Sequence, residues 1–410
     1  MIRATRTQWI KFAVVLALYL IFLVWLRSWL GLVVVPFIFD AYITKKIPWT
    51  WWRESKNRHV VTVMGWVDAI VFALVAVYFV NLYFFQNYVI PSSSLEKSLL
   101  TGDYLFVSKM SYGPRVPQTP LHMPLAQHTL PFFNCKSYLE HPQWDYKRVK
   151  GLGDVQLNDI VVFNFPAGDT VATGVPNDDI YRLSYGAGKE LAKPVDLASM
   201  TPEQQRVVYD YYYQLGREYL KENPQNFGEI ISRPVDRREN YVKRCVGLPG
   251  QTLEIKDRII YLDGKANKEP DNVQYRYLVK TKRPIPDDLA HELGISKEDM
   301  MMYYTDASVY NMPLTEKAKA GLLARKDIVV SIENTPADDA GGLYPLNMYK
   351  NWTTDNYGPV WIPKKGETVK LTIENLPVYE RPIHVYEGNE LAVKDGKIYI
   401  NGKETDEYTF

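Results

Sequence analysis

The sequence predicts a mainly β protein, built of antiparallel sheets, that is preceded by two transmembrane helices. Two observations lead to this fold class. Long apolar segments are confined to residues 12–85, and the rest of the chain alternates short β-like runs with turn residues. The chain has 410 residues, of which 46% are hydrophobic. That length and composition allow two or three compact units with substantial cores.

The first apolar region belongs to a predicted N-terminal transmembrane segment, residues 1–42. Phe12–Leu26 carries no charge, and the apolar character resumes at Trp29–Phe39 after Arg27. Neither piece alone reaches the roughly 20 residues that a helix needs to cross a bilayer. We therefore expect one long span, tilted or broken near Arg27 and Pro36. It does not resemble a cleavable signal peptide, because no small-residue cleavage site follows it.

A second transmembrane helix is predicted over residues 60–86, interrupted by Asp68 and Asn81. Residues 43–59 between the two spans carry five basic residues against one acidic residue, Glu54. Basic loops stay in the cytoplasm, so residues 87–410 are expected on the outer side. The alternative is that one apolar segment is the buried core helix of a soluble protein.

Residues 87–410 form the predicted β-rich domain. Its expected strands mix branched or aromatic residues with polar ones: Tyr104–Lys109, Ile160–Phe165, Tyr241–Val246, Thr252–Lys256 and Val369–Ile373. Two regions rich in Pro, Asp, Asn and Tyr, at about 166–238 and 266–359, are expected to be insertions. Within the first, Thr201 can cap a helix from Pro202 to about Glu222.

An internal similarity relates residues 253–265 to residues 391–403. Each copy has two β-like runs and two turn dipeptides, Asp-Arg and Asp-Gly in the first copy, Asp-Gly and Asn-Gly in the second. Asp-Gly and Asn-Gly favour tight hairpins. We expect two β-meanders with no direct part in chemistry.

Several function classes are excluded by composition. A net charge of +1 argues against a nucleic-acid-binding protein. The two cysteines, Cys135 and Cys245, cannot build a disulfide framework or a four-cysteine zinc site. His291-Glu292 is not followed by the second histidine of a metalloprotease helix. No metal or other cofactor is expected.

Two segments could carry catalytic chemistry. Pro91 is followed by the serines Ser92, Ser93 and Ser94, which taken alone are typical of a loop. In the second segment, strand alternation places Lys243 on the same face as Tyr241 and Cys245. A lysine among apolar side chains can be desolvated and lose its proton, and a neutral lysine is a competent base for a serine hydroxyl.

At these residues the sequence resembles the bacterial type I signal peptidases. Pro91-Ser92-x-Ser94, followed by Leu99 and Gly102-Asp103, is similar to the family's nucleophile segment. Residues 158–163 resemble its next signature strand, with Asn158 where Gly is usual, and residues 241–250 resemble its base-bearing segment. Three such segments in this order after two spans are a specific combination.

The resemblance implies a serine endopeptidase that cleaves signal peptides from exported preproteins without a cofactor. Ser94 would be the nucleophile and Lys243 the general base. The Ser94 backbone N–H and the Ser92 hydroxyl would form the oxyanion hole, and Ser93 would be structural. Leu95 stands where the family usually has Met, and Lys97-Ser98 where it has Pro-Thr.

The resemblance also implies partners and a location. The partners would be secretory preproteins and the lipid bilayer, with the secretion machinery as a further candidate and no nucleic acid. The chain would be a multi-pass protein of the bacterial cytoplasmic membrane with its catalytic domain on the extracytoplasmic side.

Two alternatives stay open. The family's last signature segment, with Gly-Asp-Asn, a Ser and Asp-Ser-Arg, has no counterpart before Phe410, which favours a truncated, inactive relative or a membrane-anchored scaffold that binds a partner. Ser94-x-x-Lys97 also fits the S-x-x-K motif of penicillin-binding proteins and β-lactamases. That class needs K-T-G, and residues 280–282 read Lys-Thr-Lys instead.

Overall fold

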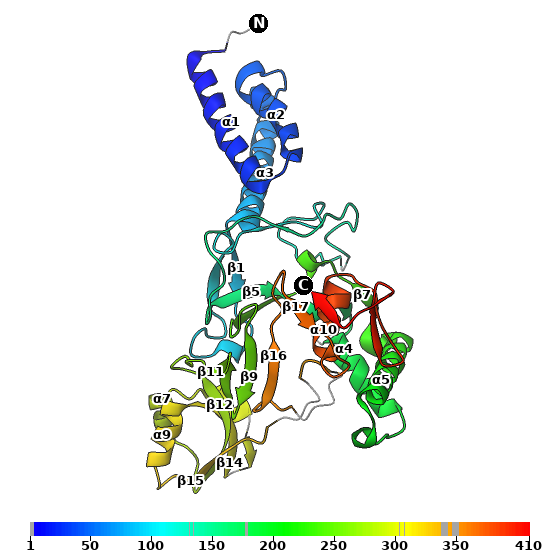
Figure 1. Ribbon diagram of the computed structural model, residues 1–410. Coiled ribbons are helices and arrows are strands. Elements are labelled where there is room, and N and C mark those ends of the chain that lie inside the picture. The colour runs from blue at the N-terminus through cyan, green and yellow to red at the C-terminus, as the bar shows by residue number, and fades with distance from the viewer. Residues whose placement is uncertain are drawn as a thin grey trace.

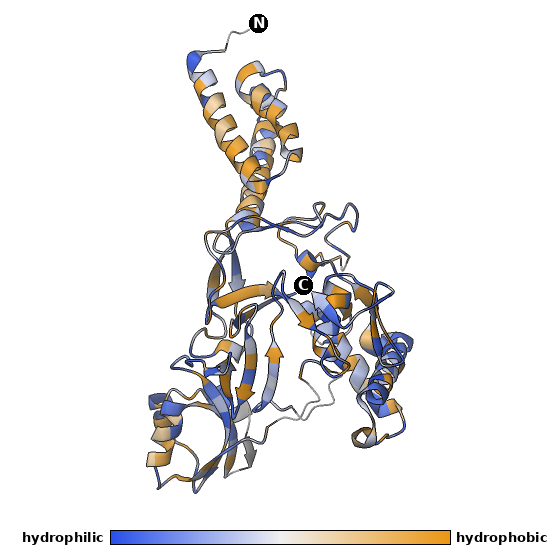
Figure 2. Cartoon of the chain, viewed as in Figure 1, coloured by the Kyte–Doolittle hydropathy of each residue, from blue (hydrophilic) through white to orange (hydrophobic). Residues whose placement is uncertain are grey.

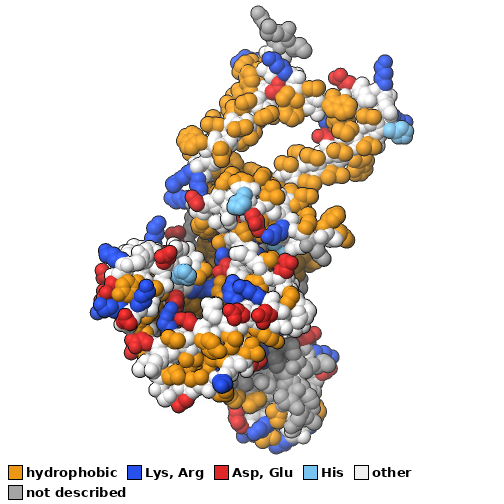
Figure 3. All heavy atoms as spheres, turned by 90° about the vertical axis from the view of Figure 1, so that its right-hand side faces the viewer, with side chains coloured by type: hydrophobic (Ala, Val, Ile, Leu, Met, Phe, Trp, Pro, Cys, Tyr) orange, Lys and Arg blue, Asp and Glu red, His pale blue; other side chains and the backbone are white. Residues whose placement is uncertain are grey.

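The computed structural model describes residues 4–130, 132–133, 135–176, 179–302, 304–306, 308–337, 343–346 and 352–410. The helices α1 (Arg6–Leu26) and α3 (Arg58–Tyr83) stand at one end of the molecule, and the sheets lie at the other (Figure 1). Figure 2 shows that these helices are mostly hydrophobic, and in Figure 3 their side chains cover the outside of this end. Both helices are long and apolar enough to cross a membrane, by length and composition.

The chain reverses direction after α1, which differs from the single long span expected over residues 12–39. Arg27 adopts left-handed backbone angles (φ 51°, ψ 42°) and ends the helix. The segment that follows contains η1 (Leu30–Val34), α2 (Val35–Phe39) and η2 (Asp40–Thr44). It returns along α1, since Tyr19 donates a hydrogen bond to the Gly31 carbonyl (2.7 Å) and the Phe12 and Phe39 rings are 5.4 Å apart. Residues 6–44 therefore form a hairpin, because a left-handed residue closes a helix and redirects the chain.

The ends of α1 and α3 that face the sheets pack together through aromatic rings. Phe22 lies 5.1 Å from Phe79 and 5.2 Å from Tyr83, measured between ring centroids. From there α3 leads through one residue, Phe84, into β1 (Phe85–Val89), which pairs antiparallel with β2 (Tyr104–Ser108). The second apolar helix is thus joined directly to the first strand pair.

The described strands all pair antiparallel, as predicted. Two four-stranded sheets have the orders β11-β10-β9-β16 and β13-β14-β12-β15, and the other strands form smaller sheets. The smaller sheets contain β3 (Arg115–Val116) with β4 (Lys147–Arg148), β5 (Ile160–Asn164) with β8 (Asn240–Arg244), β6 (Thr170–Ala172) with β7 (Ile230–Ser232), β17 (Thr368–Lys370) with β21 (Glu407–Thr409), and β18 with β19 and β20. Each of the five predicted strands overlaps an observed strand.

The internal similarity corresponds to two β-meanders, as expected. The first consists of β9 (Thr252–Lys256), β10 (Ile259–Leu262) and β11 (Lys265–Ala266). The second consists of β18 (Leu391–Lys394), β19 (Lys397–Ile400) and β20 (Lys403–Glu404). The second lies beside α10 (Leu376–Arg381) and shares a core with it.

The first insertion is helical. It contains α4 (Ile180–Leu191), α5 (Pro202–Glu222) and α6 (Pro224–Phe227), and α5 has the predicted bounds and the predicted Thr201 cap. The helices α4 and α5 touch at two glycines. A Cβ added at Gly188 would lie 1.7 Å from the Tyr212 carbonyl oxygen, and one at Gly216 would lie 1.7 Å from the Ser184 carbonyl oxygen. Only residues without a side chain allow this approach.

The second insertion folds around its own buried core. Its elements are β12 (Gln274–Thr281), α7 (Asp287–Glu292), α8 (Lys297–Met302), β13 (Tyr304–Asp306), β14 (Val309–Thr315), α9 (Glu316–Ala324) and β15 (Val329–Asn334). The strand that follows, β16 (Tyr357–Trp361), pairs with β9 of the first meander. Helix accounts for 38% of the structure and strand for 23%. The antiparallel sheets are therefore confirmed, but the description "mainly β" is not, because both insertions contain helices and of these only α5 was predicted.

A half-buried cation lies where β2 ends. Lys109 follows this strand, and its backbone N–H donates to the Phe84 carbonyl (2.7 Å). Burial, with Arg115 and Arg148 nearby, lowers the pKa of Lys109 from 10.5 to about 8.

Candidate active site

Ser94 lies in the connection of residues 90–103 between β1 and β2. Two bonds close the base of this connection, from the Gly102 N–H to the Ile90 carbonyl (2.9 Å) and from the Ile90 N–H to the Asp103 carbonyl (3.0 Å). Ser93–Leu95 forms a 3₁₀ turn inside it. These bonds continue the β1–β2 pairing by one residue on each side, so the sheet holds both ends of the connection that carries Ser94.

Lys243 reaches Ser94 from β8. In the β5–β8 ribbon Lys243 is opposite Val161, and its Nζ donates a hydrogen bond to the Ser94 Oγ at 2.5 Å. The fold thus brings together two of the predicted site residues that are 149 positions apart in the sequence.

The surroundings of this pair differ from the desolvated environment expected for the Lys243 amine. Ser94 and Lys243 are both exposed. Tyr241, on the same face of β8, stacks on Phe165 with ring centroids 4.4 Å apart and so does not cover the amine. The predicted burial of Lys243 was wrong for this structure, because a two-stranded ribbon leaves this face of β8 open to solvent.

Ser92 precedes the turn in extended backbone (φ −145°, ψ 157°) and is also exposed. Among the described residues its hydroxyl has no hydrogen-bond partner. The Ser92 hydroxyl is therefore available as a donor two residues before Ser94. Ser93 lines a cavity beside the turn instead of pairing with Lys243.

Arg244 is a site residue that the sequence analysis missed. Its guanidinium donates to the Ser98 Oγ (3.0 Å) and to the Asn158 carbonyl (2.8 Å), so it ties the serine turn to the loop before β5. The available signal was alternation, since Arg244 must point to the opposite face from Lys243. Asn158 has a φ of 69°, which explains why a Gly-to-Asn change is tolerated there, because Asn is among the few residues that adopt left-handed angles.

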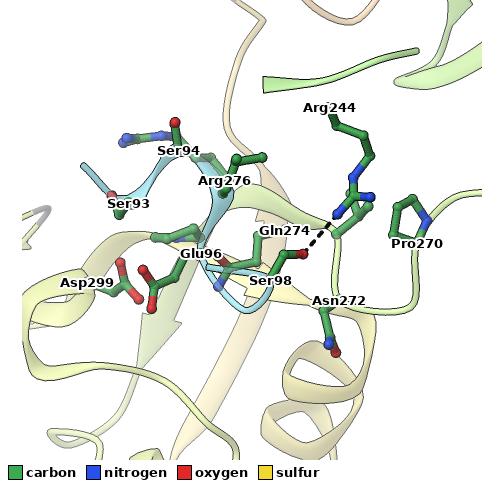
Figure 4. A pocket seen from close by; sticks show the side chains of 13 residues that line it. Ser93, Ser94, Glu96, Ser98, Arg244, Pro270, Asn272, Gln274, Arg276 and Asp299 are labelled. Atoms are coloured by element: carbon green, nitrogen blue, oxygen red, sulfur yellow. Dashed lines mark hydrogen bonds between the residues drawn. The ribbon is translucent and has the colours of Figure 1, made fainter. Parts of the chain in front are cut away.

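A cavity of about 360 Å³ lies on the Arg244 side of the serine turn (Figure 4). The residues that line it include Glu96 and Arg244, together with Arg276 and Asp299 of the second insertion. Asp299 is 7% exposed, and its Oδ2 has no hydrogen-bond partner within the part of the chain that the structure describes. The space beside the turn is therefore polar and partly built by the insertion.

The described residues contain no group of three or more His, Cys, Asp or Glu side chains that could hold a metal ion. The chemistry that this geometry can support is nucleophilic attack by a serine hydroxyl with a lysine amine as proton acceptor.

A family model described as "Signal peptidase, peptidase S26" matches residues 63–291. The chain belongs to this family. The match begins inside α3 and includes both the serine turn and the lysine strand. Family membership confirms the resemblance to type I signal peptidases, which rested on the segments around Ser94, Asn158 and Lys243.

Individual relatives agree with the family assignment. Signal peptidase I of Helicobacter pylori (strain ATCC 700392 / 26695) is 42% identical over 56 residues, which is 14% of this chain and 18% of that protein. Signal peptidase I P of Bacillus subtilis subsp. natto is 20% identical over 279 residues, 67% of this chain and 90% of that protein. Signal peptidase I of Rickettsia prowazekii (strain Madrid E) is 24% identical over 165 residues, 37% of this chain and 56% of that protein. No solved structure matches the chain.

Proposed function

We propose that this chain is a membrane-bound serine endopeptidase that removes signal peptides from exported preproteins, with Ser94 as nucleophile and Lys243 as general base. The observation that carries the proposal is the 2.5 Å contact between the Lys243 Nζ and the Ser94 Oγ in a member of the signal peptidase family. The relatives named signal peptidase I support the choice of substrate.

The proposed reaction starts from the unprotonated amine. Neutral Lys243 accepts the proton of the Ser94 hydroxyl while the Oγ attacks the scissile carbonyl carbon. The Ser94 backbone N–H and the Ser92 hydroxyl donate hydrogen bonds to the resulting oxyanion. When the intermediate collapses, the C–N bond breaks and the Lys243 ammonium returns its proton to the leaving amine of the mature protein. The signal peptide stays attached to Ser94 as an ester.

The second half repeats this chemistry with water. Lys243 accepts a proton from a water molecule, the resulting hydroxide attacks the ester, and the signal peptide leaves as a carboxylate while Ser94 recovers its proton. In this scheme the bound preprotein covers the exposed face of β8 and excludes water from the amine. Desolvation of Lys243 then comes from substrate binding and not from the fold of the free chain.

The apolar helices support a membrane location. In the proposed orientation, the hairpin of residues 6–44 and then α3 lie in the bilayer, and the sheets lie outside. The hairpin brings the basic N-terminal residues Arg6 and Lys11 to the same end as the basic loop 43–59, which agrees with the positive-inside tendency for both segments. Ser94 is nine residues beyond Phe85, so it lies within roughly 30 Å of the membrane surface, at about 3.4 Å per residue.

The test is cleavage of a preprotein by the full chain in proteoliposomes. Ser94→Ala and Lys243→Ala should each reduce processing to background, because each removes one half of the reacting pair. Lys97→Ala should leave activity largely intact. Loss of activity in Lys97→Ala with retention in Lys243→Ala would instead support the S-x-x-K class, and wild type no better than Ser94→Ala would support an inactive scaffold.

The pH profile gives a second check on the same assay. Processing should fall toward acid pH, because a protonated amine cannot accept the Ser94 proton. A rate that stays flat down to about pH 5 would contradict a lysine base.

A further inference from the structure

The cavity beside the serine turn is used neither by the Ser94–Lys243 pair nor by the hydrophobic cores. Ser94 is among the described residues that line it, and Lys243 is not. The second insertion contributes residues of β12, α8 and β14, which include Arg276, Asp299 and Pro313. We call this space the insertion cavity. A cavity that adjoins the nucleophile but not the base can hold a part of the substrate that lies to one side of the reacting bond.

Two carboxyl groups from separate parts of the chain line the insertion cavity. Asp299 is 7% exposed, and its Oδ2 has no hydrogen-bond partner among the described residues. The Glu96 side chain is 16% exposed, and the Lys97 Nζ lies 3.9 Å from its Oε1, which is longer than a hydrogen bond. Figure 4 shows the two carboxyl groups pointing toward one another. Two carboxylates in a poorly solvated space destabilise each other unless a cation joins them.

The two arginines that line the cavity do not supply this cation to Asp299. The Arg244 guanidinium is bonded to Ser98 and to the Asn158 carbonyl. Neither Arg244 nor Arg276 donates a hydrogen bond to the Asp299 Oδ2. Within the part of the chain that the structure describes, no third His, Cys, Asp or Glu side chain completes a metal site there. The arrangement therefore fits a ligand that brings its own positive charge and N–H donors, which describes a lysine or arginine side chain.

The position of the cavity indicates which part of a preprotein reaches it. Strand β1 leads away from α3, so the serine turn lies at the end of the β1–β2 pair that is far from the helices. The sheet that contains β12 and β14 lies farther still from α1 and α3 (Figure 1). In the proposed orientation the signal peptide comes from the bilayer, and the mature part of the preprotein leads away from it. A residue two positions after the cleaved bond lies roughly 7 Å along the chain, in the direction of the insertion cavity.

We propose that the insertion cavity binds a basic side chain from the first residues of the mature part of the preprotein, with Asp299 and Glu96 accepting its hydrogen bonds. This rests on the proposed function and on the membrane orientation given there. Asp299 belongs to the second insertion, so the insertion acts in the choice of substrate, while Ser94 and Lys243 perform the reaction. A preprotein with an acidic residue at the same place is disfavoured, because a third carboxylate would enter the cavity.

The first test measures binding without cleavage. The full chain with Ser94→Ala is kept in detergent, and fluorescence anisotropy gives its Kd for labelled peptides that span a preprotein cleavage site, with Lys or Glu at each of the first three mature positions. At one of these positions Lys should bind at least about tenfold more tightly than Glu, the factor that one hydrogen bond to a charged group supplies. Adding Asp299→Asn should remove most of this preference. Because Asp299 is buried, Glu96→Gln provides a second variant, from the serine turn, with the same expected result.

The matched control is Glu298→Gln, which removes the same charge from the exposed neighbouring residue of α8, outside the cavity. This variant should keep the full preference for Lys. No preference for Lys in the parent chain, or the same preference in Asp299→Asn, Glu96→Gln and Glu298→Gln, would overturn the proposal.

A second test uses the active chain in proteoliposomes and separates this proposal from the proposed reaction. Two preproteins that differ only in Lys or Glu at the selected position compete for the enzyme, and the ratio of their kcat/KM values is measured. The ratio should favour Lys in the wild type and in Glu298→Gln, and should approach one in Asp299→Asn. If both preproteins are cleaved at a ratio that Asp299→Asn does not change, the insertion cavity does not select the substrate, although the proposed function stands. If the wild type cleaves neither preprotein, the proposed function fails, while the peptide-binding result still decides whether the cavity takes a basic side chain.

Discussion

Replacing Thr119 with Val should loosen the start of the segment of residues 119–152, which contacts the end of α1 through Lys147 and Lys150 and contacts α3 through His122. The Thr119 hydroxyl is buried between two charged groups, the Asp236 carboxylate and the Arg237 guanidinium, which are 9% and 5% exposed. Valine has nearly the same shape but neither gives nor accepts a hydrogen bond. Both charged partners then stay buried with one bond fewer.

The size of the effect follows from these two bonds. A hydrogen bond to a charged group contributes about 1.5–3 kcal/mol, so the loss of two gives about 3 kcal/mol or more. Asp236 still accepts from the Gln118 and Thr119 backbone N–H groups, both at 3.0 Å, so the segment should weaken without detaching completely. At about 1.4 kcal/mol per tenfold, we expect local opening of the segment to become roughly a hundredfold more frequent.

Hydrogen–deuterium exchange of peptides that cover residues 118–130 measures this opening. The control is Thr119→Ser, which keeps the hydroxyl and should raise the exchange rate by far less. If valine and serine raise exchange equally, the hydroxyl bonds do not hold the segment, and its position beside α3 must have another cause.

Two further perturbations test packing elsewhere in the chain, at Lys109 after β2 and at the contact between α4 and α5. Burial lowers the pKa of Lys109 to about 8. Below pH 8 Lys109 is charged in both the folded and the unfolded chain, and its charge destabilises the folded one. This penalty disappears as the pH rises from 8 to the ordinary pKa of 10.5. At about 1.36 kcal/mol per pKa unit, Lys109→Met should therefore raise the free energy of unfolding at pH 7 by up to about 3 kcal/mol. Thermal denaturation measures this gain, which should vanish above about pH 10.5. A gain that is the same at all pH values would contradict the burial of the Lys109 charge. Gly188→Ala should separate α4 from α5 and cost at least about 2 kcal/mol, because the new Cβ would overlap the Tyr212 carbonyl. The control is Gly186→Ala in the same helix, where the new Cβ would have no other atom within 4 Å and should stabilise the chain by about 0.5–1 kcal/mol. Thermal unfolding followed by circular dichroism compares the two variants, and equal losses of stability would refute the close contact.

Local patterns predicted much of the fold. The helix at Pro202–Glu222 follows from its capping residue Thr201 and from Glu203 in its first turn, and the two meanders follow from their turn dipeptides. These elements are specified by residues close in sequence, so a single sequence contains the information. The direction of the chain after Arg27 is different, because it depends on one backbone conformation that a charged residue rarely adopts.

The candidate site likewise combines features that follow from local sequence with features that depend on the whole fold. Ser94 and Lys243 were identified from family-like segments, and the β5–β8 and β1–β2 pairings bring their side chains into contact. The exposure of Lys243 could not be predicted, because alternation says which side chains share a face but not whether anything covers that face. The bridging role of Arg244 was missed for a similar reason, since its partners Ser98 and Asn158 lie in loops whose positions depend on the whole fold.

The reversal at Arg27 has a consequence for biogenesis. In the proposed orientation, Arg27 is at the tip of the first hairpin and must be carried through the hydrocarbon, whereas Arg6 and Lys11 stay where they were synthesised. Once across, the carbonyl of Arg27 accepts its bond from Lys147, which is made 120 residues later. The tip of the hairpin therefore lacks this bond until the exported domain has been translocated as far as Lys147 and has folded against it.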